Sequence, residues 1–119
     1  MSVRLAPLLF PLDPGIRYVA RNRQGAIVEM EQNPKWPSHN PAETDRMEEL
    51  IVNPIVLEAT RRRGDLDLEG LDYVVIRYGI QYQAIFPLPD GHVSVGVEHS
   101  ADIASVASRI ADALSKTVH

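Results

Sequence analysis

Two stretches in the C-terminal half of the chain largely alternate between apolar and polar residues, at 80–86 and 92–98. A period of two places successive side chains on opposite faces of a β-strand, and in the second stretch three valines share one face. The joining segment Leu88-Pro89-Asp90-Gly91 has typical turn chemistry, because proline presets φ, aspartate bonds its own backbone and glycine accepts a positive φ. The pattern therefore predicts a β-hairpin.

Three further strands are predicted from short runs rich in β-branched and aromatic residues, at 16–21, 26–31 and 73–77. The first two flank Asn22-Arg23-Gln24-Gly25, a turn ending in glycine that is typical of a hairpin. Because short connections of this kind join neighbouring antiparallel strands, we expect an antiparallel sheet.

A long central helix is predicted over about residues 41–63. Asn40 is a good N-cap and Pro41 suits the first helical position. Pro54 removes a backbone donor from the helix, so we expect a kink or break near Asn53. Five apolar residues follow helical spacing: Met47, Leu50, Ile51, Pro54 and Ile55.

The ends of the helical segments are predicted from capping residues. We expect Gly64 to end the central helix and 65–72 to form an acidic connector. Ser100 is expected to cap a final helix, and its apolar stripe consists of Ile103, Val106, Ala107, Ile110 and Leu114.

Residues 1–15 contain three prolines and several large apolar residues. Proline removes amide donors and restricts the preceding residue, so we expect an extended arm here, packed on this domain or on a second copy. The remaining residues, 16–119, form one domain in the order strand, strand, helix, strand, strand, strand, helix. The predicted fold class is α+β, with a five-stranded antiparallel sheet.

Composition narrows the function classes. The 119 residues have a net charge of −4, which gives no reason to expect a nucleic acid or an anionic membrane as partner. The absence of cysteine excludes disulfides, thiolate metal sites and cysteine nucleophiles. The proline-rich N-terminal run is too short for a signal peptide or a membrane span, and a cytoplasmic location is expected.

We find no motif that carries catalysis, a cofactor or a metal. Asp65, Asp67, Glu69 and Gly70 match the opening of a calcium loop, but Ile76 stands where its last carboxylate ligand belongs. No glycine-rich phosphate loop or nucleophile elbow is present. The histidines, including His92, are expected at the surface. We therefore predict that the chain is not an enzyme and binds no cofactor or metal.

Three surface features are candidates for contact with a partner. Trp36 lies in a proline-rich loop, where the indole either folds back onto the core or anchors a partner. Arg61, Arg62 and Arg63 either form a solvated helix end or dock an acidic partner. The strand that begins at Tyr73 has no lysine or proline to blunt it, so as a sheet edge it would invite pairing with a second copy.

The element order and three segments resemble the roadblock family of dynein light-chain-like proteins. These segments are Arg21–Val28 with its turn, Tyr78–Val95 with its closing strands, and the final helix at 101–114. The resemblance implies a profilin-like layered fold without enzymatic activity. It also implies dimers that form through an edge strand and the central helices, and action on small Ras-like GTPases or as a scaffold subunit.

On this chain the resemblance, together with the unblunted strand, places the homodimer interface on seven residues: Tyr73, Val75, Arg77, Met47, Leu50, Ile51 and Ile55. Members of the family begin with a helix, whereas the prolines of residues 1–15 predict none here. An alternative function is a small-ligand sensor with a pocket between sheet and helix, lined by Gly96, Ser94 and Tyr82. A third is a metal-free enzyme that uses a buried histidine or carboxylate.

Overall fold

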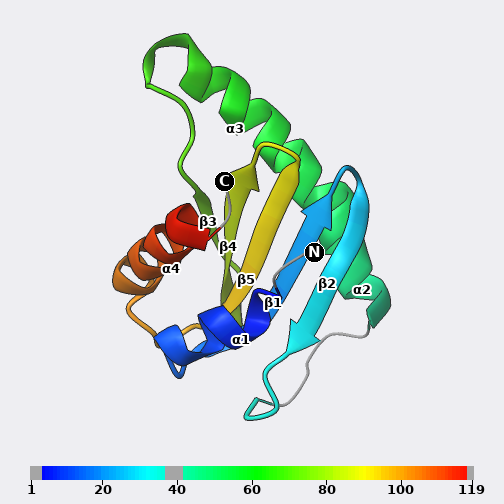
Figure 1. Ribbon diagram of the computed structural model, residues 1–119, viewed down its shortest axis with the longest axis vertical. Coiled ribbons are helices and arrows are strands. Elements are labelled where there is room, and N and C mark those ends of the chain that lie inside the picture. Colours follow the sequence, from blue (N-terminus) through cyan, green and yellow to red (C-terminus); the bar gives the residue numbers. More distant parts are fainter. Residues whose placement is uncertain (1–3, 37–41, 118–119) are drawn as a thin grey trace.

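The computed structural model describes residues 4–36 and 42–117. Five strands and three longer helical segments make up an α+β domain of three layers, with one sheet between two layers of helix (Figure 1). The strands are β1 (Ile16–Arg23), β2 (Ala26–Gln32), β3 (Val74–Arg77), β4 (Gln81–Leu88) and β5 (Gly91–Glu98). The helical elements are α1 (Ala6–Leu9), η1 (Phe10–Leu12), α2 (Ala42–Met47), η2 (Glu48–Val52), α3 (Asn53–Asp67) and α4 (Ile103–Thr117).

The sheet is antiparallel throughout, with the strand order β2-β1-β5-β4-β3. The predicted fold class is therefore confirmed. Two hairpins arise as the sequence predicts, and in the first the turn residues Gln24 and Gly25 both have positive φ, 52° and 84°. The segment from α2 to α3 crosses one face of the sheet and connects its two outer strands, β2 and β3 (Figure 1).

The apolar core lies on the opposite face, beneath α1 and α4 (Figure 1). The three valines of β5 point into it, as their alternation predicts, and they pack against the predicted stripe of α4. The largest fully buried apolar side chains of this core are Leu5, Leu9, Ile16, Val19, Val93, Val95, Val97, Val106 and Ile110. Burial of this surface supplies the main hydrophobic stabilisation of the fold.

The expectation that residues 1–15 contain no helix was wrong. Pro7 lies in the first turn of α1, where a missing N–H costs nothing. Glu29 on β2 accepts hydrogen bonds from the backbone N–H groups of Leu5 and Ala6, at 2.8 Å each, and so caps the helix from another element. Leu5 and Leu9 are fully buried in the core of the same chain. This segment therefore packs on its own domain.

The central helix breaks next to Asn53, as Pro54 predicts. The break takes the form of a π-helical turn, η2, in which Asn53 N–H donates to the carbonyl of Glu48, five residues earlier. Pro54 has no N–H to offer the carbonyl of Leu50, and a widened turn accommodates this loss. The predicted cap, Asn40 with Pro41, lies outside the described residues.

Two predicted helix ends were wrong. The helix α3 continues through Gly64 to Asp67, because a side chain at Gly64 would lie 2.9 Å from the backbone of Gly70, which folds back over it. The carbonyl of Gly64 accepts from the N–H groups of Leu68 and Gly70, and these bonds close the helix. At α4 the capping side chain is Asp102 rather than Ser100, since Asp102 Oδ1 accepts from Ser105 N–H at 3.4 Å.

Candidate functional site

The segment α2–η2–α3 turns polar residues toward the sheet. Four residues at intervals of four are buried against it: Asp45, Glu49, Asn53 and Leu57. The apolar residues predicted to form the helix stripe instead face outward, and Ile51 and Ile55 are 54% and 66% exposed. An amphipathic helix normally buries its apolar side. This reversal leaves an exposed apolar helix surface, which we define as Met47, Leu50, Ile51 and Ile55.

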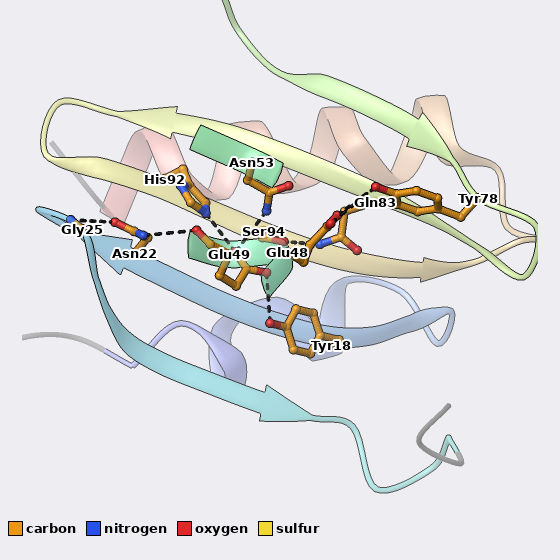
Figure 2. A network of polar contacts seen from close by, with 10 residues as sticks. All are labelled: Tyr18, Asn22, Gly25, Glu48, Glu49, Asn53, Tyr78, Gln83, His92 and Ser94. Carbon is orange, nitrogen blue, oxygen red and sulfur yellow. Dashed lines mark hydrogen bonds and ion pairs between the residues drawn. The ribbon is translucent and has the colours of Figure 1, made fainter. Parts of the chain in front are cut away.

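A buried hydrogen-bond network explains why the polar side faces inward (Figure 2). The carboxylate of Glu49 is completely buried. It accepts from Tyr18 Oη at 3.0 Å and from Asn53 Nδ2 at 3.1 Å, and it lies 2.9 Å from His92 Nε2. A carboxylate can only accept, so the imidazole tautomer that fits has its proton on Nε2. Three elements of the fold therefore converge on one glutamate.

The sheet face beneath the helix is polar in the same way. Asn22 on β1 donates from Nδ2 to the carbonyl of Glu49 at 3.3 Å, and its Oδ1 accepts from Gly25 N–H at 3.1 Å. Gln83 on β4 donates to the hydroxyl of Ser94 on β5, within the same layer (Figure 2). This layer orients the helix by directional bonds rather than by apolar packing.

A cavity of about 310 Å³ opens between this helix segment and the sheet. The register shift between Ile16 and Tyr18 brings both Arg17 and Tyr18 to the cavity side of β1. Its lining includes three acidic side chains, Asp45, Glu48 and Glu49, and one basic side chain, Arg17. Met47, Val52 and Ile80 add apolar surface. The volume lies at the lower end of ligand pockets, which span about 300–1,000 Å³.

Electrostatics in the cavity follow from burial. Burial and the nearby Glu49 carboxylate raise the pKa of Tyr18 far above its ordinary value, so the hydroxyl stays protonated as a donor. Burial also raises the pKa of Glu48, with smaller contributions from Glu49 and Asp45, while the hydrogen bond from Tyr78 opposes the shift. The pKa of Tyr78 is raised by burial and by Glu48. The cavity wall therefore holds negative charge at a cost.

The predicted edge strand is an edge of the sheet. β3 pairs with β4 on one side only, at the end of the strand order. Val75 is 38% exposed, and Arg77 lies over the ring of Tyr82 at 5.1 Å. Tyr73 precedes the strand and packs against the core, with its ring 5.4 Å from that of Phe86. Of the predicted β3 residues, Val75 and Arg77 are thus the exposed ones.

The exposed helix surface continues toward β3. Tyr78, in the turn after β3, donates from Oη to the Glu48 carboxylate at 3.2 Å. Ile80 in the same turn is half exposed and lines the cavity together with Met47. The structure thus brings the two predicted parts of the interface, the helix and the edge strand, next to one another.

The other predicted partner residues interact within the chain. Trp36 donates from Nε1 to the carbonyl of Pro14 at 2.9 Å, and the guanidinium of Arg17 lies 5.1 Å from its ring centroid. Of the arginines at the end of α3, Arg61 donates to the carbonyl of Leu88 at 2.7 Å. Arg62 and Arg63 form i,i+4 ion pairs with Glu58 and Asp67, at 2.8 Å and 2.5 Å. These contacts match the simpler interpretation of each group.

Sequence reasoning missed the network. His92 was expected at the surface, and that was wrong, since it is 3% exposed and paired with Glu49. The available signal was the four-residue spacing of Asp45, Glu49 and Asn53, which marks one side of a helix as acidic and amidic. Tyr82 was expected in a ligand pocket, but it packs on the core side of the sheet.

Two searches of the described residues bear on chemistry. Within residues 4–36 and 42–117, no group of three or more histidine, aspartate or glutamate side chains is arranged to hold a metal ion. In the same ranges, no helix combines the length and the apolar character needed to cross a membrane.

Three solved structures are similar to this chain. One, described as MglB with a tetrameric arrangement, aligns with a TM-score of 0.69 and 15% identity over 96% of this chain and 87% of that chain. A Roadblock/LC7 domain from Streptomyces avermitilis gives 0.67 and 13%, over 96% and 94%. The gliding protein MglB from Thermus thermophilus gives 0.67 and 13%, over 93% and 85%.

The chain therefore has the roadblock/LC7 fold, and the resemblance noted in the sequence is confirmed at that level. Identities of 13–15% make this a statement about fold. No protein-family model and no curated protein matches the sequence.

Proposed function

We propose that this protein is a non-enzymatic, cytoplasmic, homodimeric interaction module that acts on a small Ras-like GTPase or serves as a scaffold subunit. The observation that carries the proposal is the exposed apolar helix surface next to the β3 edge. Apolar surface of this kind on a monomer marks an interaction site. An edge strand without lysine or proline is suited to extension by a second chain.

A second copy of this chain is the first occupant that this surface supports. The helix and the β3 edge adjoin, so one partner can contact both. A two-fold interface uses the same patch on both subunits, and an apolar patch is complementary to itself. A similar solved structure is described as having a tetrameric arrangement, which supports self-association as a property of this fold.

The oligomeric state tests this proposal directly. We expect sedimentation equilibrium to give twice the chain mass of 13.3 kDa at micromolar concentration. Ile51→Lys on the helix and Val75→Lys on β3 should each weaken association by about a hundredfold or more, because a lysine would be buried without a partner. Val28→Lys, an exposed residue on the opposite edge strand β2, is the matched control. A monomeric wild type would contradict the proposal.

The GTPase partner requires a separate experiment. Wild type and Ile51→Lys are used as bait in extract of the native cell, loaded with either GDP or a non-hydrolysable GTP analogue. Enrichment of a Ras-like GTPase by wild type, dependent on the nucleotide and lost in Ile51→Lys, supports the GTPase proposal. Recovery of stable non-GTPase subunits in both nucleotide states supports the scaffold role instead.

A specific observation also favours a second candidate function, a small-ligand sensor. The cavity of about 310 Å³ combines apolar lining with a few buried polar groups, which is the usual character of a ligand site. Met47 lines this cavity and also belongs to the exposed helix surface. A ligand bound there would therefore contact the same helical turn that faces a partner.

A further inference from the structure

The cavity lining has an excess of negative charge. It contains three carboxylates and one guanidinium, Arg17. That guanidinium already has an acidic partner outside the cavity lining, because Arg17 Nη1 lies 3.7 Å from Glu98 Oε2. The cavity thus provides acidic groups whose charge is not balanced by Arg17.

Glu48 is the acidic group at the cavity wall with the weakest support. Its hydrogen bond comes from the neutral hydroxyl of Tyr78, at 3.2 Å, whereas Glu49 receives three polar partners in the network. Burial and the charges of Glu49 and Asp45 raise the pKa of Glu48, so its carboxylate form is disfavoured in the empty cavity. A positive charge beside it would relieve this penalty.

An independent feature asks for a donor at the same place. Asn53 Oδ1 is buried and has no hydrogen-bond partner among the described residues. In Figure 2 this oxygen lies on the side of Asn53 that faces Gln83 and Glu48, both of which line the cavity. A buried acceptor without a donor is costly, and natural proteins rarely leave one unsatisfied.

We propose that this cavity binds an organic cation, an alkylammonium or alkylguanidinium group, either as a free small molecule or as a lysine or arginine side chain of a protein. The N–H donors of the cation meet the carboxylates, and its alkyl part contacts Met47, Val52 and Ile80. This inference rests on the second candidate function and does not require self-association. It also specifies a ligand of side-chain size, in keeping with the volume.

The test compares a charged probe with its neutral isostere on the wild-type protein. Calorimetric or NMR titrations use n-butylguanidinium and n-butylurea, which differ in charge but hardly in shape. We expect the guanidinium to bind with a Kd of about 1 mM, as suits a fragment-sized ligand, and the urea at least about tenfold more weakly. Equal binding of the two probes would overturn the inference.

A variant identifies the site. Glu48→Gln keeps the shape and can still accept from Tyr78, and it should weaken guanidinium binding at least about tenfold. Glu58→Gln is the matched control, because Glu58 is exposed on α3 and does not line this cavity. Unchanged binding in Glu48→Gln refutes the site, and circular dichroism of the same sample verifies that it is folded.

A second pair of probes distinguishes the two sources of the cation. A blocked tripeptide with one central arginine is compared with the same peptide containing citrulline. Binding of n-butylguanidinium alone assigns the cavity to free small molecules, and charge-dependent binding of the arginine peptide assigns it to a protein side chain. Binding of neither cation up to about 20 mM refutes the inference. Sedimentation of the same samples reports separately whether self-association fails.

Discussion

Removing the carboxylate of Glu49 is the sharpest test of the buried network. In Glu49→Ala, three groups lose their acceptor: Tyr18 Oη, Asn53 Nδ2 and His92 Nε2. Their residues are at most 5% exposed, so water does not replace the lost bonds without rearrangement. Each buried donor left without a partner costs about 1–3 kcal/mol.

The sum of three such terms is about 3–9 kcal/mol, and water entering the space left by the side chain reduces it. Removal of one member of a buried charge pair typically costs about 3–5 kcal/mol. We therefore expect Glu49→Ala to lose about 3–5 kcal/mol. That is a large part of the total free energy of unfolding of an ordinary domain, about 5–15 kcal/mol.

Urea unfolding followed by circular dichroism measures this loss, at one fixed protein concentration so that any self-association contributes equally. Glu58→Ala, which removes an exposed glutamate of the same helix, should change the free energy of unfolding by less than about 0.5 kcal/mol. Tyr18→Phe removes a single donor and should cost about 0.5–1.5 kcal/mol. A loss below about 1 kcal/mol in Glu49→Ala would refute the assigned role of the network.

Three further predictions concern Glu48, Glu29 and Gly64. Because the folded state raises the pKa of Glu48 above its ordinary value of 4.5, stability should fall as pH rises through the interval between the two values. Glu48→Gln should therefore raise the free energy of unfolding at pH 7 and lose this gain below pH 4.5, and an equal gain at both pH values in urea unfolding would contradict this. Glu29→Ala should cost about 0.5–2 kcal/mol by uncapping α1, whereas the exposed Glu31→Ala should cost less than about 0.5; equal losses would show that the cap is unimportant. Gly64→Ala should lose about 1–3 kcal/mol through the contact with Gly70, while Gly79→Ala, with open space around it, is the control; a stabilised Gly64→Ala variant would mean that helix propensity outweighs the contact.

Much of the architecture could be predicted because it depends on local patterns. Alternation over two residues places the β5 valines in the core, and turn residues define both hairpins. Pro54 marks the break in the central helix through its missing N–H. The helix α1 could not be predicted in this way, because its cap, Glu29, lies on another element more than twenty residues away.

The candidate site was predicted in part. The exposed helix residues and the β3 edge were selected from the sequence, and the structure places them next to each other. The sequence did not indicate that the helix turns its polar side inward. That orientation depends on Tyr18 and His92, which are 31 and 43 positions from Glu49, and no short-range pattern joins them.

The sequence by itself determined the strands, the turns, the α4 stripe and the position of the helix break, since each depends on neighbours within a few residues. Only the tertiary structure decided which side of the central helix is buried. The hydrogen bonds of a carboxylate to donors on two strands outweigh the apolar character of the opposite side. That choice leaves Met47, Leu50, Ile51 and Ile55 exposed and creates the cavity beside Glu48.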